Sequence, residues 1–394
     1  MSKDKYWLLP EGVDESLPYE ASGIESLRRS MLDNFSRWGY QLVIPPIIEY
    51  VDSLLAGGAE DLDLQTFKVV DRVTGRLIGL RADMTPQLTR IDTHRMPTKS
   101  PQRLCYAGPV AHTFSEKFAG SRNPLQIGAE LFGHSGVESD AEIITLLVNS
   151  LLIANIRSLT LEVTHIGIFR GICAAASFTH EFEDQVLEAL VKKDRTSLTE
   201  MLEGEGVDSV VMTNLLLLID LNGDLDIINE ARKKFSGLPE SVSEAIEELA
   251  ALCDLLKQFI PEVELHVDLA ELRGYRYHSG IMFAAYVPEM GRSIAWGGRY
   301  DGVQKQLGRD RGATGFSTDL RILEQFLEKD ERFETVVIAP SGNDKKLLAA
   351  MGRYRKEGYT VIQSLPGQSD EWNQLSIEFR LVSRNDEWIL ERSK

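Results

Sequence analysis

Alternating polar and apolar residues predict two antiparallel strands between Leu104 and Gly133, joined by a polar loop. In the second strand the apolar positions are Leu125, Ile127, Ala129 and Leu131, and the polar positions are Gln126, Gly128 and Glu130. The apolar face can pack on a core. The other face presents a carboxamide and a carboxylate with a glycine between them, which leaves room for a close approach and suits a ligand ammonium group. A solvated outer face of the sheet explains the same pattern, so the strand alone leaves both interpretations open.

Two further elements are expected before these strands. They are a helix over 18–38, opened by Pro18, and a hairpin over 67–80 with its turn at 71–76. Arg81, Asp83 and Thr85 then share one face if the second hairpin strand continues. Pro86 ends that strand, so a helix can follow.

The pattern changes after residue 140. The predicted elements are an apolar helix at 141–154, a strand at 159–169, nearly continuous helix at 178–260, strands at 263–272, 280–287 and 293–303, and a strand entering a helix at 313–328. The helical stretch has no strand-like alternation and closes at Pro261, so we interpret it as an insertion. Beyond residue 330 a strand, a helix to about Lys356 with Gly358 as its stop, a strand and a final hairpin predict a small α/β unit.

Hairpins link most of these strands and the helices are segregated, which predicts an α+β fold around an antiparallel sheet flanked by helices. We divide the chain into a core of residues 1–177 and 262–330, a helical insertion of 178–261, and a C-terminal α/β unit of 331–394. A chain of 394 residues is long enough for two or three domains, each with its own core.

The composition is that of a globular protein, with 43% hydrophobic and 26% charged residues. The sequence shows no apolar signal core and no apolar run of membrane-spanning length, and its three cysteines lack metal-binding spacing. We therefore expect a cytoplasmic protein without a metal centre, with Cys253 as a buried thiol and no membrane partner. A net charge of −17 argues against tRNA or DNA as a partner, because nucleic-acid binders usually carry a basic footprint.

Several motifs follow one another in the order of a known family. They are an initial helix, GYQLVIPPIIE at 39–49, LRADMT at 80–85, the stretch from Gly108 to Glu130, LRGYRYHSG at 272–280, GGRYDG at 297–302 and ATGFSTDLR at 313–321. From about Leu8 to Leu327 the chain resembles the catalytic core of class II aminoacyl-tRNA synthetases, specifically histidyl-tRNA synthetase. The RADMTPQ segment at 81–87 is similar to the paralogues that serve as ATP phosphoribosyltransferase regulatory subunits.

The resemblance implies a pocket for L-histidine. The residues that match the family's pocket motifs are Asp83, Thr85, Gln126, Glu130, Arg273, Tyr277 and His278. Asp83 takes the place of a glutamate that holds the ligand ammonium group, with Thr85 beside it. By the same resemblance Arg273 pairs with the ligand carboxylate and Tyr277 lies against the imidazole, whereas His278 replaces a tyrosine.

The ATP half of the family's site is altered. His112 stands where motif 2 has an arginine for the α-phosphate, and Phe114 where a glutamate reads the adenine amino group. In motif 3, Ile322 replaces the arginine that grips the terminal phosphate, and Asp319 replaces a glycine. Adenylation needs positive groups preorganised around the phosphate, and a largely neutral histidine does not replace a guanidinium. These losses predict a degenerate ATP site and no catalytic residues.

The resemblance therefore implies a non-catalytic regulatory subunit that needs no cofactor. Such a subunit joins the short-form catalytic subunit of ATP phosphoribosyltransferase, activates it, and lets L-histidine inhibit the first step of histidine biosynthesis. It also implies a dimer, formed through the motif 1 region at 39–49, within a hetero-oligomer. The alternative is an active, short histidyl-tRNA synthetase-like enzyme in which Arg122, Arg299 and Arg321 still bind a triphosphate. A third interpretation is an interaction protein whose pocket is a relic. Residues 331–394 resemble either a reduced anticodon-binding domain or an unrelated stabilising unit.

Overall fold

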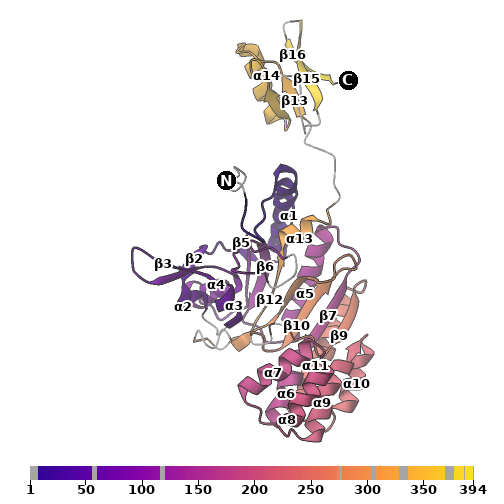
Figure 1. Ribbon diagram of the computed structural model, residues 1–394. Helices are drawn as coiled ribbons and strands as arrows, with labels where there is room; N and C mark the ends of the chain where they lie inside the picture. Colours follow the sequence, from indigo (N-terminus) through magenta and orange to yellow (C-terminus); the bar gives the residue numbers. More distant parts are fainter. Residues whose placement is uncertain are drawn as a thin grey trace. The chain divides into compact units, whose positions relative to one another are not determined.

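The computed structural model describes residues 8–55, 60–115, 120–272, 274, 277–302, 308–309, 311–327, 336–368, 377–385 and 387–393. The chain divides into two compact units, residues 1–327 and 328–394 (Figure 1). None of the described helices is long and apolar enough to cross a membrane.

A large sheet organises the first unit. Its described strands are β1 (Gln41–Leu42), β5 (Gln102–Pro109), β6 (Leu125–Phe132), β7 (Thr160–His165), β8 (Asn222–Gly223), β9 (Glu264–Asp268), β10 (Ile281–Tyr286), β11 (Ser293–Arg299) and β12 (Ala313–Asp319). They lie in the order β1-β5-β6-β12-β11-β10-β7-β9-β8. This arrangement confirms the α+β class, although the sheet is mixed, because β1–β5 and β7–β9 are parallel pairs. A parallel neighbour requires a crossover, and the helices after β7 provide one.

The helices of the first unit lie on both faces of this sheet and beyond one edge. They are α1 (Pro18–Arg37), α2 (Val51–Leu54), α3 (Glu60–Gln65), α4 (Thr85–Arg90), the π-helix η2 (Ile91–Arg95), α5 (Val137–Ile153), α6 (Ile166–Ala175), α7 (His180–Val191), α8 (Arg195–Gly204), α9 (Ser209–Asp220), α10 (Asp226–Lys234), α11 (Glu240–Phe259) and α13 (Leu320–Glu324). The expected helix at 18–38 is confirmed: it buries Leu27, Met31 and Phe35, and the chain turns at Gly39 with φ of 84°. Helix α5 packs on β6, β11 and β12, and buries their apolar side chains.

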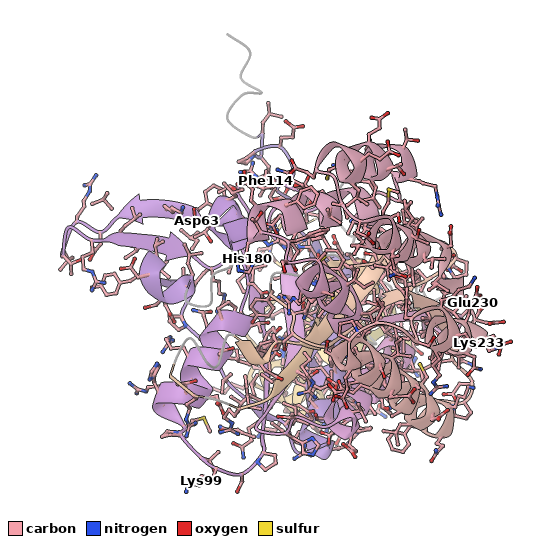
Figure 2. The ribbon with its side chains drawn as sticks, turned by 90° about the horizontal axis from the view of Figure 1, so that it is seen from below. Asp63, Lys99, Phe114, His180, Glu230 and Lys233 are labelled. Atoms are coloured by element: carbon pink, nitrogen blue, oxygen red, sulfur yellow. The ribbon has the colours of Figure 1, made fainter. Side chains whose placement is uncertain are left out.

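Helices α6 to α11 gather beyond the β7–β9 edge of the sheet (Figure 1). His180 at the start of α7, and Glu230 and Lys233 on α10, are exposed on the outside of this group (Figure 2). The apolar stripe of α11 buries Cys253, which confirms the expected buried thiol. The predicted continuous helix is in fact five helices and the short strand β8, because turns at positive-φ residues such as Lys193 and Gly206 interrupt it.

One local prediction is wrong, and a condition attached to another is not met. The strand expected at 159–169 ends at His165, because this side chain caps α6 by accepting a hydrogen bond from the Gly167 N–H at Nδ1 (3.0 Å). The condition that would place Arg81, Asp83 and Thr85 on one strand face is not met, because β4 stops at Leu80, whereas the helix that can follow is confirmed as α4, which begins at Thr85. The preceding hairpin is confirmed as part of a three-stranded sheet of β2 (Ile48–Tyr50), β4 (Leu77–Leu80) and β3 (Phe67–Val70).

The second unit has the expected strand, helix, strand and hairpin. Its elements are β13 (Val336–Ala339), α14 (Lys345–Lys356), β14 (Thr360–Gln363), β15 (Ile377–Arg384) and β16 (Glu387–Arg392). The sheet order is β14-β13-β15-β16. Asp344 caps α14 by accepting from the Leu347 N–H (3.1 Å), and Gly358 ends the turn after it with φ of 94°.

Candidate functional site

Hydrogen-bonded registers place one line of residues across the large sheet on the face opposite α5. From β7 to β5 this line is Glu162, Ala284, Trp296, Ser317, Gly128 and Tyr106. Gly128 is the glycine that the sequence singled out. A Cβ there would lie 2.3 Å from the Phe316 carbonyl oxygen and 2.5 Å from the Tyr106 hydroxyl. The close approach expected at this glycine is therefore made by neighbouring strands.

The Glu130 carboxylate is buried in this face, with 1% of the residue exposed. Thr85 Oγ1 donates to Oε1 (2.9 Å), Tyr106 OH donates to Oε1 (3.3 Å), and Tyr300 OH donates to Oε2 (2.6 Å). Burial raises the pKa of Glu130 to about 8, although these hydroxyl donors lower it. Gly315 makes room for this carboxylate, because a Cβ there would lie 1.6 Å from Oε2.

Asp83, Gln126 and Thr85 continue this hydrogen-bond network. Gln126 Nε2 donates to Asp83 Oδ1 (2.8 Å), and Gln126 Oε1 accepts from the Met84 N–H (3.0 Å). The Thr85 N–H also donates to Asp83 Oδ1 (3.0 Å), which fixes the carboxylate at the start of α4. Four of the predicted pocket residues are thus joined in one network, and burial of Gln126 and Glu130 contradicts the solvated-face interpretation.

The loop before β10 supplies the remaining predicted pocket residues. The Tyr277 ring stacks on Tyr300 with centroids 5.0 Å apart, which places it next to the partner of Glu130. Burial lowers the pKa of His278 to about 4, so this ring is neutral at pH 7. Arg273, the predicted carboxylate ligand, lies outside the described residues.

A cavity of about 420 Å³ lies over this face of the sheet. Among the predicted residues, its lining includes Asp83, His112, Gln126, Tyr277, His278 and Ile322. Phe114 is 44% exposed and is not part of the lining; Figure 2 labels it at the surface. The cavity has space for a small molecule, and the Asp83–Gln126 pair opens into it.

None of the described residues that replace the family's ATP-binding side chains presents a guanidinium to the cavity. His112 Nε2 lies 2.9 Å from the Ala82 carbonyl oxygen, which only accepts, so this nitrogen carries the proton. Asp319 Oδ1 accepts from the Leu125 N–H (3.0 Å) and the Arg321 N–H (3.0 Å). Burial raises the pKa of Asp319, and Arg292, which also lines the cavity, lowers it less strongly.

The three arginines of the alternative interpretation bind within the protein. Arg122 Nε donates to the His112 carbonyl oxygen (3.1 Å). Arg299 Nη2 donates to Asp140 Oδ2 (2.8 Å), and its side chain is 6% exposed. Arg321 Nη1 donates to Ser16 Oγ. Each guanidinium is therefore already committed to structural contacts.

Sequence reasoning missed three residues that shape the site: Tyr106, Tyr300 and Gly315. Tyr106 and Gly315 lie on predicted strands, and Tyr300 lies in the GGRYDG motif. Their only sequence signal was membership of these segments. Their role depends on strand register, which brings Tyr300 to Glu130 across 170 residues of chain.

Comparisons with known proteins agree with this geometry. A family model described as histidyl-tRNA synthetase matches residues 12–323, and one described as the ATP phosphoribosyltransferase subunit HisZ C-terminal domain matches 334–391. The chain is 48% identical to the ATP phosphoribosyltransferase regulatory subunit of Alkalilimnicola ehrlichii over 93% of this chain and 92% of that one. It is 45% identical to the corresponding protein of Methylococcus capsulatus over 98% and 96%.

Two solved structures share the fold. An ATP phosphoribosyltransferase regulatory subunit/histidyl-tRNA synthetase from Bacillus halodurans has a TM-score of 0.83 at 24% identity, covering 94% of this chain and 96% of that one. Histidyl-tRNA synthetase from Nostoc has a TM-score of 0.77 at 18% identity, covering 95% and 91%. At these identities the likeness extends to the fold alone.

Proposed function

Because this chain belongs to the family of ATP phosphoribosyltransferase regulatory subunits, we propose that it is the histidine sensor of such an enzyme. In this proposal it activates the short-form catalytic subunit, and L-histidine bound in its cavity inhibits the first step of histidine biosynthesis. The observation that carries the proposal is the network from Asp83 through Gln126 and Thr85 to Glu130.

The two ends of this network suit the two ends of histidine. Asp83 lines the cavity with a carboxylate and Gln126 with a carboxamide, which together offer acceptors to the ligand ammonium group. Tyr277 also lines the cavity, and its ring, stacked on the Tyr300 that bonds the buried Glu130, is suited to the imidazole. These charged and polar contacts contribute most to the stability of bound histidine, because its polar groups exchange water for preorganised partners.

The proposal includes no adenylation by this chain. Transfer to the α-phosphate requires preorganised positive charge, whereas the substituted positions carry His112, Ile322 and the buried carboxyl of Asp319. The cations Arg299 and Arg321 are hydrogen-bonded elsewhere. These contacts disfavour the synthetase alternative.

Inhibition requires L-histidine to bind two states of the complex with unequal affinity, and the coupling is reciprocal. The catalytic subunit therefore changes histidine affinity by the same factor by which histidine changes the equilibrium of the complex. We also propose that the chain forms dimers through residues 39–49 within a hetero-oligomer. Leu42, Ile44 and Ile47 in this segment are exposed apolar side chains, which an interface would bury.

Glu130→Gln tests the sensor. This substitution keeps the volume but replaces the carboxyl group by a carboxamide, whose NH2 group meets the hydroxyl donors of Thr85 and Tyr300, so we expect histidine affinity to fall at least about tenfold. Feedback inhibition of the assembled enzyme is lost in parallel, whereas activation of the catalytic subunit persists. Calorimetric titration with histidine and assay of the complex measure the two effects, and Glu230→Gln on the exposed face of α10 is the control.

Two results contradict the proposal. One is unchanged histidine affinity in Glu130→Gln, and the other is loss of activation with feedback preserved. Histidine-dependent ATP–pyrophosphate exchange by the wild-type chain separates the sensor from the synthetase alternative. Exchange at a synthetase-like rate supports the enzyme, whereas saturable histidine binding without exchange supports the sensor.

A further inference from the structure

Strands β7 and β9 place two acids and a histidine together at one end of the sheet face. The parallel register pairs Glu162 with His266, and the same register continued by two residues brings Thr164 beside Asp268. Side chains at alternate positions share a face, so these four form a two-by-two array. The ligating atoms of Glu162, His266 and Asp268 all lie within 4.8 Å of one another.

Within the part of the chain that the structure describes, two polar atoms of this array are buried without a hydrogen-bond partner. They are Oε1 of Glu162 and Oγ1 of Thr164. Thr164 is 3% exposed, and both side chains line the cavity. A buried polar atom that lacks a partner is costly, so neighbouring unpaired oxygens indicate a missing polar or cationic partner.

The charge of the array also favours a cation. The Glu162 and Asp268 carboxylates have ligating atoms within 4.8 Å of each other, and Glu271 adds a further negative charge close enough to act on Glu162. Lys193 Nζ donates to Asp268 Oδ2 (2.6 Å), and this lysine side chain is 42% exposed. A divalent cation would compensate both acids at once, and the exposed lysine can turn to solvent.

Glu162 and Thr164 line the same cavity as the proposed histidine pocket, but the array is built on strands distant from Glu130. Glu130 is on β6, and β12, β11 and β10 lie between it and Glu162 on β7. Four strand spacings of about 4.8 Å amount to roughly 19 Å, which is more than one amino acid can span. The array therefore needs an occupant of its own.

We propose that Glu162, His266 and Asp268 bind a divalent transition-metal cation. Two carboxylates and one imidazole are ligands that suit Zn²⁺ or Mn²⁺, whereas Ca²⁺ and Mg²⁺ favour oxygen ligands alone. The cation would link β7 to β9, and the unpartnered Thr164 Oγ1, on the same strand face as Glu162, would accept from a water bound to it. The proposal does not depend on the histidine sensor, because the two sites share no residue.

Zn²⁺ titration of the full-length protein, after treatment with a chelator, tests this site. We expect one tightly bound equivalent in the wild type and at least about tenfold weaker binding in Glu162→Gln and in His266→Ala. Lys193→Ala removes the ammonium group that competes for Asp268, so we expect this variant to bind Zn²⁺ more tightly than the wild type. The matched control is Glu264→Gln. It removes an acid of β9 that is not part of the array, so we expect Zn²⁺ affinity to stay unchanged.

Circular dichroism of each variant shows whether it is folded before titration. If Glu162→Gln does not fold, the other two variants still test the site, because Zn²⁺ affinity is expected to fall in His266→Ala and to rise in Lys193→Ala. The proposal is overturned if the wild type binds no Zn²⁺ at micromolar concentration, or if Zn²⁺ binding is the same in the wild type and His266→Ala.

Discussion

Gly315→Ala tests the placement of Glu130 most directly, because it changes the carboxylate's surroundings without touching its chemistry. The new methyl group would lie 1.6 Å from Glu130 Oε2 and 2.4 Å from its Cδ. Ordinary contact requires about 3.5 Å, so the carboxyl group must move by roughly 2 Å. The 2.6 Å hydrogen bond from Tyr300 does not survive such a shift.

The cost follows from two terms. A buried polar group that loses its partner costs about 1–3 kcal/mol, and overpacking of a filled site costs about 1–3 kcal/mol. We therefore expect Gly315→Ala to lower the free energy of unfolding by about 4 kcal/mol. Histidine affinity falls at least about tenfold, because the imidazole end of the pocket is displaced.

Urea unfolding and calorimetric titration with histidine measure these effects, with Gly291→Ala as the control because its added Cβ meets nothing within 4 Å. The double variant Gly315→Ala/Glu130→Ala separates the cause, since removal of the carboxylate relieves the clash. Its destabilisation is expected to be smaller than the sum of the two single effects. Wild-type stability in Gly315→Ala, or additive effects in the double variant, would refute the reasoning.

Two further predictions concern buried ionisable groups. Burial raises the pKa of Glu130 from 4.5 to about 8, so between these pH values the folded protein holds a proton that the unfolded chain has released. The free energy of unfolding of the ligand-free protein therefore falls as pH rises through this window. Urea unfolding between about pH 5 and 8 should show this free energy falling more steeply in the wild type than in Glu130→Gln. Asp140→Asn leaves the buried Arg299 guanidinium only the longer 3.4 Å ion pair with Asp301 and should cost about 3 kcal/mol in urea unfolding. Glu25→Gln, which breaks an exposed pair with Arg28, should cost about 1 kcal/mol or less, and equal costs in the two variants would contradict this account.

Patterns local to the chain were enough to predict the elements that position the proposed histidine pocket. Period-two alternation from Leu125 to Leu131 predicted strand β6 and its apolar face, since successive side chains of a strand point to opposite sides. Apolar spacing predicted α1, and turn residues predicted the β3–β4 hairpin, because both depend on interactions between residues close in the chain. Motif order identified Asp83, Gln126 and Glu130 as one candidate site before their contacts were known.

What surrounds these residues depends on contacts between segments distant in the chain. Burial of Glu130 depends on Tyr300 and Gly315, which approach it through the register of β6 with β12 and the turn after β11. His266 and Asp268 become neighbours of Glu162 only because the helices after β7 return the chain parallel to it. Local periodicity carries no information about such pairings, since they arise from crossover direction and strand register. The physical reason is that desolvation and charge compensation depend on residues distant in the chain, whereas the face of a strand depends on its nearest neighbours.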